Sequence, residues 1–218
     1  MIVAIDGPAA SGKSTTAKFL AEKLGFVHLN SGLLYRAITY IFINNNCIND
    51  TTFDNDFLNN LNLTVEGKKF NNIFYNNDNI TNNLRSEEIS KNIKFISNDS
   101  KVRKKINHIQ RNLVKNKNVV CEGRDIGSVV FPNAEFKFYL NAEVGSRVLR
   151  RFKEQVINSN NRTCKDEIKK DLINRDNNDL KRKISPLIKT NDSIEIDTTH
   201  LTIEEQVDKI YDIIKKGI

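Results

Sequence analysis

The chain has 218 residues, which is enough for one hydrophobic core of about 150 to 200 residues and one small excursion. With 39% hydrophobic and 28% charged residues, its composition excludes a disordered chain and favours a soluble globular one. The net charge of +7 favours polyanionic ligands, either nucleic acid or nucleotides that carry several phosphates, and does not choose between them.

The cysteines and the apolar runs bear on the compartment. Cys47, Cys121 and Cys164 are far apart in the sequence, so they form neither a zinc-binding pattern nor a redox pair. An odd number of cysteines without a disulfide framework fits a reducing compartment. The N-terminus does not resemble a signal peptide, and no apolar run approaches the ~20 residues of a membrane helix. We therefore expect a cytoplasmic protein.

Strand-like runs alternate with amphipathic helical patterns along most of the chain. Strands are expected at residues 2–6, 26–29, 119–122, 136–140 and 193–197. Helices are expected at residues 13–24, 31–42, 144–157, 164–174 and 203–215. This alternation predicts an α/β fold with a parallel sheet and helices on both faces. Asparagine favours turns, so we expect the Asn-rich stretches to be loops.

Residues 61–81 break this alternation. Apolar residues recur there with period two between Asn-rich turns, which predicts a small antiparallel meander. Helical patterns follow at residues 87–96 and 102–114. We expect an inserted subdomain at about residues 37–110, within a single domain that spans residues 1–218.

Residues 7–14 match the phosphate-binding pattern G-x-x-x-x-G-K-[ST], with a predicted strand before them and a predicted helix after. The two glycines let backbone N–H groups converge on one anion, and the helix adds its positive end. Lys13 is expected to reach the β- and γ-phosphates of ATP, and the Ser14 hydroxyl to bind Mg²⁺. The candidate ATP-binding residues are Gly7, Pro8, Ala9, Ala10, Ser11, Gly12, Lys13, Ser14 and Thr15.

Other proteins with this phosphate loop fit the chain poorly. A GTPase needs a guanine-reading Asn-Lys-x-Asp, and the nearest string, at residues 116–119, lacks the aspartate. Helicases and transporter ATPases need more domains than 218 residues supply. A small kinase with a small acceptor remains.

Such a kinase holds two anions head to tail, so arginines from several segments must converge on one cleft. Arg124 and Asp125 directly follow the predicted strand at residues 119–122, at the edge where α/β sheets bind ligands.

Further strings make the assignment specific. They read Ser-Gly-Leu-Leu-Tyr-Arg at residues 31–36, Glu-Gly-Arg-Asp-Ile-Gly-Ser-Val-Val-Phe-Pro at 122–132 and Arg-Asp-Asn-Asn-Asp at 175–179, with Arg182, Pro186 and Leu187 after them. Together with residues 5–14, they resemble the bacterial cytidylate kinase family over essentially the whole chain.

The resemblance implies phosphoryl transfer from MgATP to CMP and dCMP, in the fold of the P-loop nucleoside monophosphate kinases. It implies the CMP-binding residues Ser31, Arg36, Arg103, Arg124, Asp125, Arg175, Asp179 and Arg182. The arginines would hold the acceptor phosphate, except for Arg103, which would read the base. The acids and Ser31 would meet the sugar hydroxyls. A helical lid at about residues 147–165 is also implied, and its Arg147, Arg150 and Arg151 would act with Lys13 on the transferred group.

The chain departs from the family pattern at several positions. Asn30 stands where an Asp is usual, and Asn178 replaces a commonly basic residue. Glu122 stands where Asp is common and keeps an acid in the outer shell of Mg²⁺. Lys94 falls where a base-contacting serine is expected, which bears on base selectivity.

Two rival functions remain at this point. Another nucleoside monophosphate kinase would differ only in its base pocket. A non-catalytic nucleic-acid-binding module is the second rival, and the lack of a nucleic-acid motif counts against it. We expect a monomer that binds nucleotides and has no nucleic-acid or membrane partner.

Overall fold

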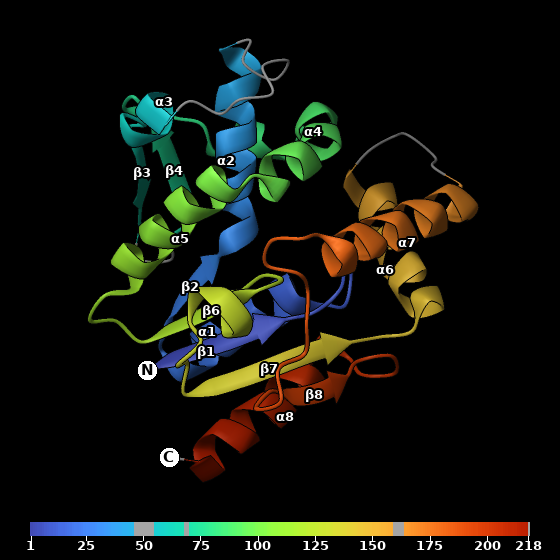
Figure 1. Cartoon of the computed structure of the whole chain (residues 1–218). Helices are drawn as coiled ribbons and strands as arrows, with labels where there is room; N and C mark the ends of the chain where they lie inside the picture. The colour runs from blue at the N-terminus through green and yellow to red at the C-terminus, as the bar shows by residue number, and fades with distance from the viewer. Residues whose placement is uncertain (46–54, 68–69, 159–163, 218) are drawn as a thin grey trace.

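The computed structural model describes residues 1–45, 55–67, 70–158 and 164–217 (Figure 1). It confirms the predicted parallel α/β sheet, whose strand order is β2-β6-β1-β7-β8. The strands are β1 (Ile2–Asp6), β2 (Val27–Asn30), β6 (Val119–Glu122), β7 (Phe136–Asn141) and β8 (Ile194–Asp197). Every pair is parallel, so the carboxyl ends of all strands meet at one edge.

The central strand β1 shows why the sheet is covered on both faces. Val3 and Ile5 pack against α1 (Lys13–Leu24) and α8 (Ile203–Gly217) on one face. Ala4 points to the other face, where it packs with residues such as Ile126 and Val130. A strand buried on both faces is expected to be a continuous apolar run, and β1 and β6 are such runs up to the acid that ends each of them, Asp6 and Glu122.

The predicted meander is also confirmed, as a three-stranded antiparallel sheet in the order β3-β4-β5. The elements of this insert are α3 (Asn55–Asn59), β3 (Leu63–Glu66), β4 (Asn72–Tyr75), β5 (Asp78–Asn79), the short 3₁₀ helix η1 (Thr81–Arg85), α4 (Glu87–Asn98) and α5 (Ser100–Val114). Its apolar side chains form a core of their own against α2 (Ser31–Asn44). The expected insert boundary near residue 37 falls inside α2, because Ile38 and Ile41 belong to this second core.

The C-terminal half carries a pair of packed helices, α6 (Val144–Asn158) and α7 (Lys165–Lys181). Figure 1 shows this pair at the carboxyl ends of β1 and β7, and the insert rising over the sheet beside it. Parts of the predicted insert and lid, at residues 46–54, 68–69 and 159–163, lie outside the described residues, as does Cys47.

Some local predictions were wrong. The sequence predicted loops at Asn-rich stretches and a helical segment that ends at residue 174, yet α7 runs through Asn177 and Asn178 to Lys181. Buried Ile168 and Leu172 pack this helix onto α6 and the phosphate loop, and this burial overrides the weak turn preference of asparagine.

The insert is also joined to the main sheet through Phe70. This residue has a φ of 48°, and its buried ring lies in the apolar cluster of Val114, Val119 and Cys121, beneath the sheet. The ammonium of Lys117 lies 4.9 Å from the ring centroid. Phe70 thus places one loop of the insert in the core of the main sheet.

Within the described part of the chain, no helix combines the length and the apolar character needed to cross a membrane.

Candidate active site

The phosphate loop joins β1 to α1 in the conformation that the two glycines predict. Gly7 has a φ of 148° and Gly12 a φ of 93°, both in the region that favours glycine. A Cβ on Gly7 would lie 2.0 Å from the carbonyl oxygen of Leu140, so no other residue fits there. Helix α1 starts directly after Gly12, which leaves its first N–H groups pointing at the loop.

Lys13 is buried inside this loop. Its Nζ donates to the Pro8 carbonyl at 2.5 Å and to Ser11 Oγ at 3.2 Å. Burial, followed by repulsion from Arg124 and Arg175, lowers the pKa of Lys13 well below its usual value. Ser14 and Thr15, in the first turn of the helix, are exposed. A phosphate that enters the loop would place negative charge beside the Lys13 ammonium and so stabilise its charged form.

The predicted acceptor residues come together on the neighbouring strand end and on α7. Arg124 Nε donates to Asp179 Oδ2 at 2.9 Å, and Arg182 Nη1 donates to Asp179 Oδ1 at 3.3 Å. Arg182 Nη2 also lies 3.8 Å from Asp125 Oδ1. The pairs Arg124–Asp179 and Arg182–Asp125 join residues that are more than fifty positions apart, so the sequence strings that suggested them do share one site.

Two further arginines leave this cluster with surplus positive charge. Arg175 remains accessible to solvent, yet the surrounding protein and the nearby Arg124 lower its pKa to about 10. The charge of Arg36 also lowers the pKa of Arg175. The pKa of Arg36 is itself lowered, first by burial and then by the charges of Arg151 and Arg85. Several cations gathered at one cleft, where neighbouring charges lower the pKa of Arg175 and of Arg36, create a site for an anion.

Arg36 also contacts the insert. Its Nη1 donates to the Leu84 carbonyl at 3.0 Å and to Ser90 Oγ at 3.2 Å. The side chain therefore links α2 to η1 and to the start of α4. Movement of the insert relative to the sheet would change these contacts directly.

The predicted base-reading residue lies beside the acceptor cluster. Arg103 Nη1 donates to the Tyr35 hydroxyl at 2.7 Å and to Asp125 Oδ2 at 3.2 Å. Burial, partly opposed by the Arg103 charge, raises the pKa of Tyr35 to about 12, so its hydroxyl keeps its proton. Arg103 Nε is buried and has no hydrogen-bond partner within the part of the chain that the structure describes. Lys94 on α4 is exposed.

The three predicted lid arginines differ in their surroundings. Arg147 is buried and donates to the Ala9 carbonyl at 3.1 Å, to the Ala142 carbonyl at 3.0 Å and to Asp176. Arg150 donates to Thr198, whose hydroxyl in turn donates to the Ser11 carbonyl. Arg147 and Arg150 thus hold α6 to the phosphate loop and its neighbours.

Arg151 is partly exposed, in contrast to buried Arg147, and its charge acts on arginines of the acceptor side. It pairs with Glu154 at 2.8 Å, and its charge lowers the pKa of both Arg36 and Arg175. Of the three, Arg151 is the one that the structure brings close to the acceptor arginines.

The remaining predicted residues line the same edge. Ser31 is buried at the start of α2, and its Oγ would lie 2.6 Å from a Cβ on Gly123. Glu122 is buried at the end of β6, and its charge acts on Lys13. No described residue forms a hydrogen bond with its Oε1. An unpartnered buried carboxylate oxygen near the phosphate loop fits an outer-shell role toward a cation.

Sequence reasoning assigned no role to two buried aspartates. Asp176 accepts from the Ala9 N–H at 3.0 Å as well as from Arg147, so it connects α7 to the phosphate loop. Asp6 accepts from the N–H groups of Ile126 and Gly127 at 2.9 and 2.7 Å, and burial raises its pKa to about 6. Their positions in the sequence could have pointed to them, because Asp6 directly precedes the phosphate loop and Asp176 directly follows Arg175.

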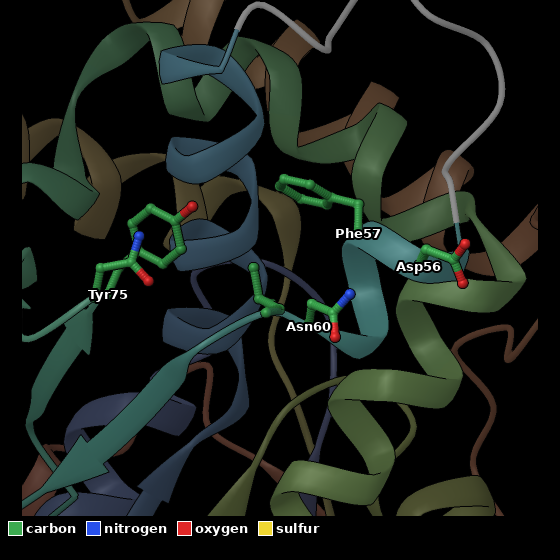
Figure 2. A pocket seen from close by; sticks show the side chains of 6 residues that line it. Asp56, Phe57, Asn60 and Tyr75 are labelled. Atoms are coloured by element: carbon green, nitrogen blue, oxygen red, sulfur yellow. The ribbon is translucent and has the colours of Figure 1, made fainter.

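A separate hollow of about 440 Å³ lies in the insert, between α3 and β4 (Figure 2). Asp56, Phe57, Asn60 and Tyr75 are among its lining residues. None of the predicted site residues lines it, so it plays no part in the site described above.

The family model for cytidylate kinase matches residues 3–216 of the chain. A cytidylate kinase of Fusobacterium nucleatum subsp. nucleatum is 41% identical over 217 residues, covering 99% of this chain and 98% of its own. A cytidylate kinase of Ligilactobacillus salivarius is 38% identical over 216 residues, covering 98% and 96%. A crystal structure of a Thermus thermophilus protein matches the fold with a TM-score of 0.52 at 15% identity, covering 100% and 97% of the two chains.

Proposed function

The chain belongs to the cytidylate kinase family, and from that premise we propose that its cleft transfers the γ-phosphoryl group of ATP to CMP and dCMP. The products are ADP and CDP or dCDP. The chain is thus an ATP-dependent nucleoside monophosphate kinase. The observation that carries the assignment to this cleft is that Arg124 and Arg175 lower the pKa of Lys13, and Arg124 also that of Arg175, because a phosphate-loop lysine that feels the charge of the acceptor arginines lies in the same cleft as they do.

The two substrates occupy adjacent parts of this cleft. ATP places its phosphates in the loop of residues 7–14, where Lys13 and the first N–H groups of α1 face them. The acceptor phosphate takes the surplus charge of Arg36, Arg124, Arg175 and Arg182. The sugar hydroxyls meet Ser31, Asp125 and Asp179, whose arginine partners hold the two carboxylates in place.

Transfer itself depends on positioning and on charge. The transition state spreads negative charge over the transferred group, and Lys13 with Arg151 neutralises it. Arg147 and Arg150 act from α6, through the backbone of the phosphate loop and Thr198. No covalent intermediate and no dedicated general base are required.

The residues of the site fit a magnesium ion carried by ATP. Among the described residues, no cluster of His, Cys, Asp and Glu would hold a metal alone. Mg²⁺ usually keeps several waters and binds substrate phosphates plus one or two protein oxygens. The exposed Ser14 hydroxyl would be such an oxygen, and Glu122 Oε1 would act on the ion from its outer shell. When bound, the ion would neutralise the charge of the β- and γ-phosphates.

The insert and the lid are proposed to close over the two nucleotides. Residues of about 37–110 would carry Arg103 onto the base, and residues of about 147–165 would carry Arg151 onto the phosphates. The free thiols of Cys121 and Cys164 support a cytoplasmic location. We also propose that the protein is a monomer and has no nucleic-acid partner.

An ADP-release assay with a panel of nucleoside monophosphates tests the function. We expect turnover with CMP and dCMP that depends on Mg²⁺, and little ADP release without an acceptor. Preference for another monophosphate would make the chain a different kinase of the same type. No turnover with any acceptor, combined with salt-dependent RNA or DNA binding, would support the nucleic-acid module instead.

A further inference from the structure

The carboxylate of Asp6 joins the two halves of the cleft. Asp6 is the last residue of β1 and directly precedes Gly7, the first residue of the phosphate loop. Its Oδ1 accepts from Ile126 N and its Oδ2 from Gly127 N. These two N–H groups directly follow Asp125, so one side chain connects the ATP side to the acceptor side.

The segment that Asp6 holds is a single turn of π-helix, η2 (Ile126–Val130). Val130 N donates to the Asp125 carbonyl at 3.0 Å, and Phe131 N donates to the Ile126 carbonyl at 2.7 Å. Such turns are rare and occur mostly at functional sites, because their geometry is held by the surrounding structure. The position of Arg124 and Asp125 therefore depends on what fixes this turn.

A second charged side chain holds the other end of the turn. Arg111 of α5 donates from Nε to the Val130 carbonyl and from Nη2 to the Val129 carbonyl, both at 3.0 Å. A carboxylate at the N–H end and a guanidinium at the carbonyl end match the dipole of the turn. Asp6 and Arg111 thus clamp η2 from opposite ends.

The hydrogen bonds of Asp6 to η2 are formed although burial of its carboxylate costs desolvation free energy. Asp6 is 6% exposed, and no cation lies in hydrogen-bond contact with its carboxylate among the described residues. A buried carboxylate whose pKa is raised by desolvation costs folding free energy in its charged form. A purely apolar packing role would be better served by a neutral side chain.

We propose that Asp6, with Arg111, is a positioning residue that holds Arg124 and Asp125 in place for the acceptor nucleotide. This inference rests on the proposed function of the cleft. Asp6 touches no substrate in this arrangement and acts through the backbone of η2. The two clamps should therefore affect CMP and leave ATP nearly untouched.

The test is calorimetric binding of CMP and of ATP, each alone, to Asp6→Asn. Asparagine keeps one acceptor oxygen and turns an amide donor toward the second N–H. We expect the Kd for CMP to rise ~10-fold, the scale of losing one hydrogen bond to a charged group, with the Kd for ATP within ~2-fold of wild type. Asp208→Asn, at an exposed ion pair with Lys23, is the matched control and should change neither value.

A second pair of variants decides the case if Asp6→Asn does not fold. Arg111 is exposed, so Arg111→Gln should fold, and we expect it to raise the Kd for CMP ~3-fold, the scale of a half-exposed hydrogen bond. Lys104→Gln, an exposed cation on the same helix, should not. A merely structural role predicts lower thermal stability with unchanged Kd in the folded fraction.

The failures of the two proposals are distinguishable. Wild-type protein that binds CMP while Asp6→Asn and Arg111→Gln bind it equally well overturns the positioning role alone. Equal weakening of CMP and ATP also overturns it. Wild-type protein without affinity for CMP overturns the proposed function and this inference together.

Discussion

The guanidinium of Arg103 and the carboxylate of Asp125 form an ion pair of 3.2 Å in which the side chains are only 3% and 5% exposed. Arg103 belongs to α5 of the insert, and Asp125 follows β6 of the main sheet. The pair therefore joins the two parts of the molecule at the place where the base and the sugar are expected to bind. Arg103 Nε, buried without a partner, is free to donate to a ligand.

Base selectivity follows from this donor. Cytosine presents an acceptor at N3, whereas uracil presents a donor there, and arginine can only donate. A charged donor left unpaired by the wrong base costs about 1–3 kcal/mol or more. We expect kcat/KM for CMP to exceed that for UMP at least ~10-fold, and Arg103→Ala to remove most of the difference.

The ratio of the two kcat/KM values is the right measurement, because Arg103→Ala also breaks a buried ion pair, a change that costs about 3–5 kcal/mol of stability. A smaller folded fraction lowers both activities equally and leaves their ratio unchanged. Lys94→Ser is the companion variant: since Lys94 is exposed, it should alter the ratio little. Equal use of CMP and UMP by the wild-type protein would contradict the base-reading role.

Lys13→Ala should separate activity from stability. Removing one preorganised contact to the transferred group should lower kcat by at least ~10²-fold. The free energy of unfolding should not fall, because burial lowers the pKa of Lys13 and its charge is a cost to the folded protein. Kinetics and thermal unfolding of the same sample give both values. Near-normal turnover in folded Lys13→Ala would contradict the assigned role.

The acceptor arginines should act on one substrate. Arg124→Ala, Arg175→Ala and Arg182→Ala should each raise KM for CMP more than KM for ATP. Arg124→Lys should fail as well, because an ammonium does not reproduce the planar bidentate contacts of a guanidinium. Titrating each substrate at saturating concentrations of the other measures the two constants. An equal loss for ATP would place these residues on the wrong side of the cleft.

Closure of the insert and the lid should be visible by hydrogen exchange. We expect a bisubstrate inhibitor that links adenosine and cytidine through phosphates to protect α4 and the second half of α6. Either nucleotide alone should protect them less, because closure needs both. The first half of α6 should change little, since Arg147 already ties it to the phosphate loop. Unchanged exchange in α4 and α6 would remove the closure proposal and leave the kinase assignment standing.

The sequence predicted the parts of the fold that have strong periodicity. The strand around Val3 and Ile5, the phosphate loop and the antiparallel meander all follow from patterns of apolar residues and glycine. The short helices α3, η1 and η2 were not predicted, because five residues are too few to show a helical period. Asn177 and Asn178 misled the prediction, since their environment in α7 is set by distant contacts.

The site divides in the same way. The phosphate-binding pattern needs only local sequence. Arg124 was found because it follows a predicted strand, whereas Arg36, Arg175 and Arg182 were assigned through the family resemblance. The clamps on η2 could not be predicted, because Asp6 meets Gly127 across 121 positions and Arg111 reaches η2 from another element. The different surroundings of Arg147, Arg150 and Arg151 likewise depend on the tertiary packing of α6.

Phe70 makes the insert inseparable from the rest of the molecule. Its ring fills part of the core beneath the main sheet, between Val114 and Val119, although it is borne by a loop of the antiparallel meander. A shortened chain that lacked the meander would therefore open a void in a core that lies outside the insert, at the ~3–5 kcal/mol scale of a Phe→Ala change. A relative with a shorter insert would need another side chain to fill this part of the core, so we expect insert length and core composition to change together among relatives.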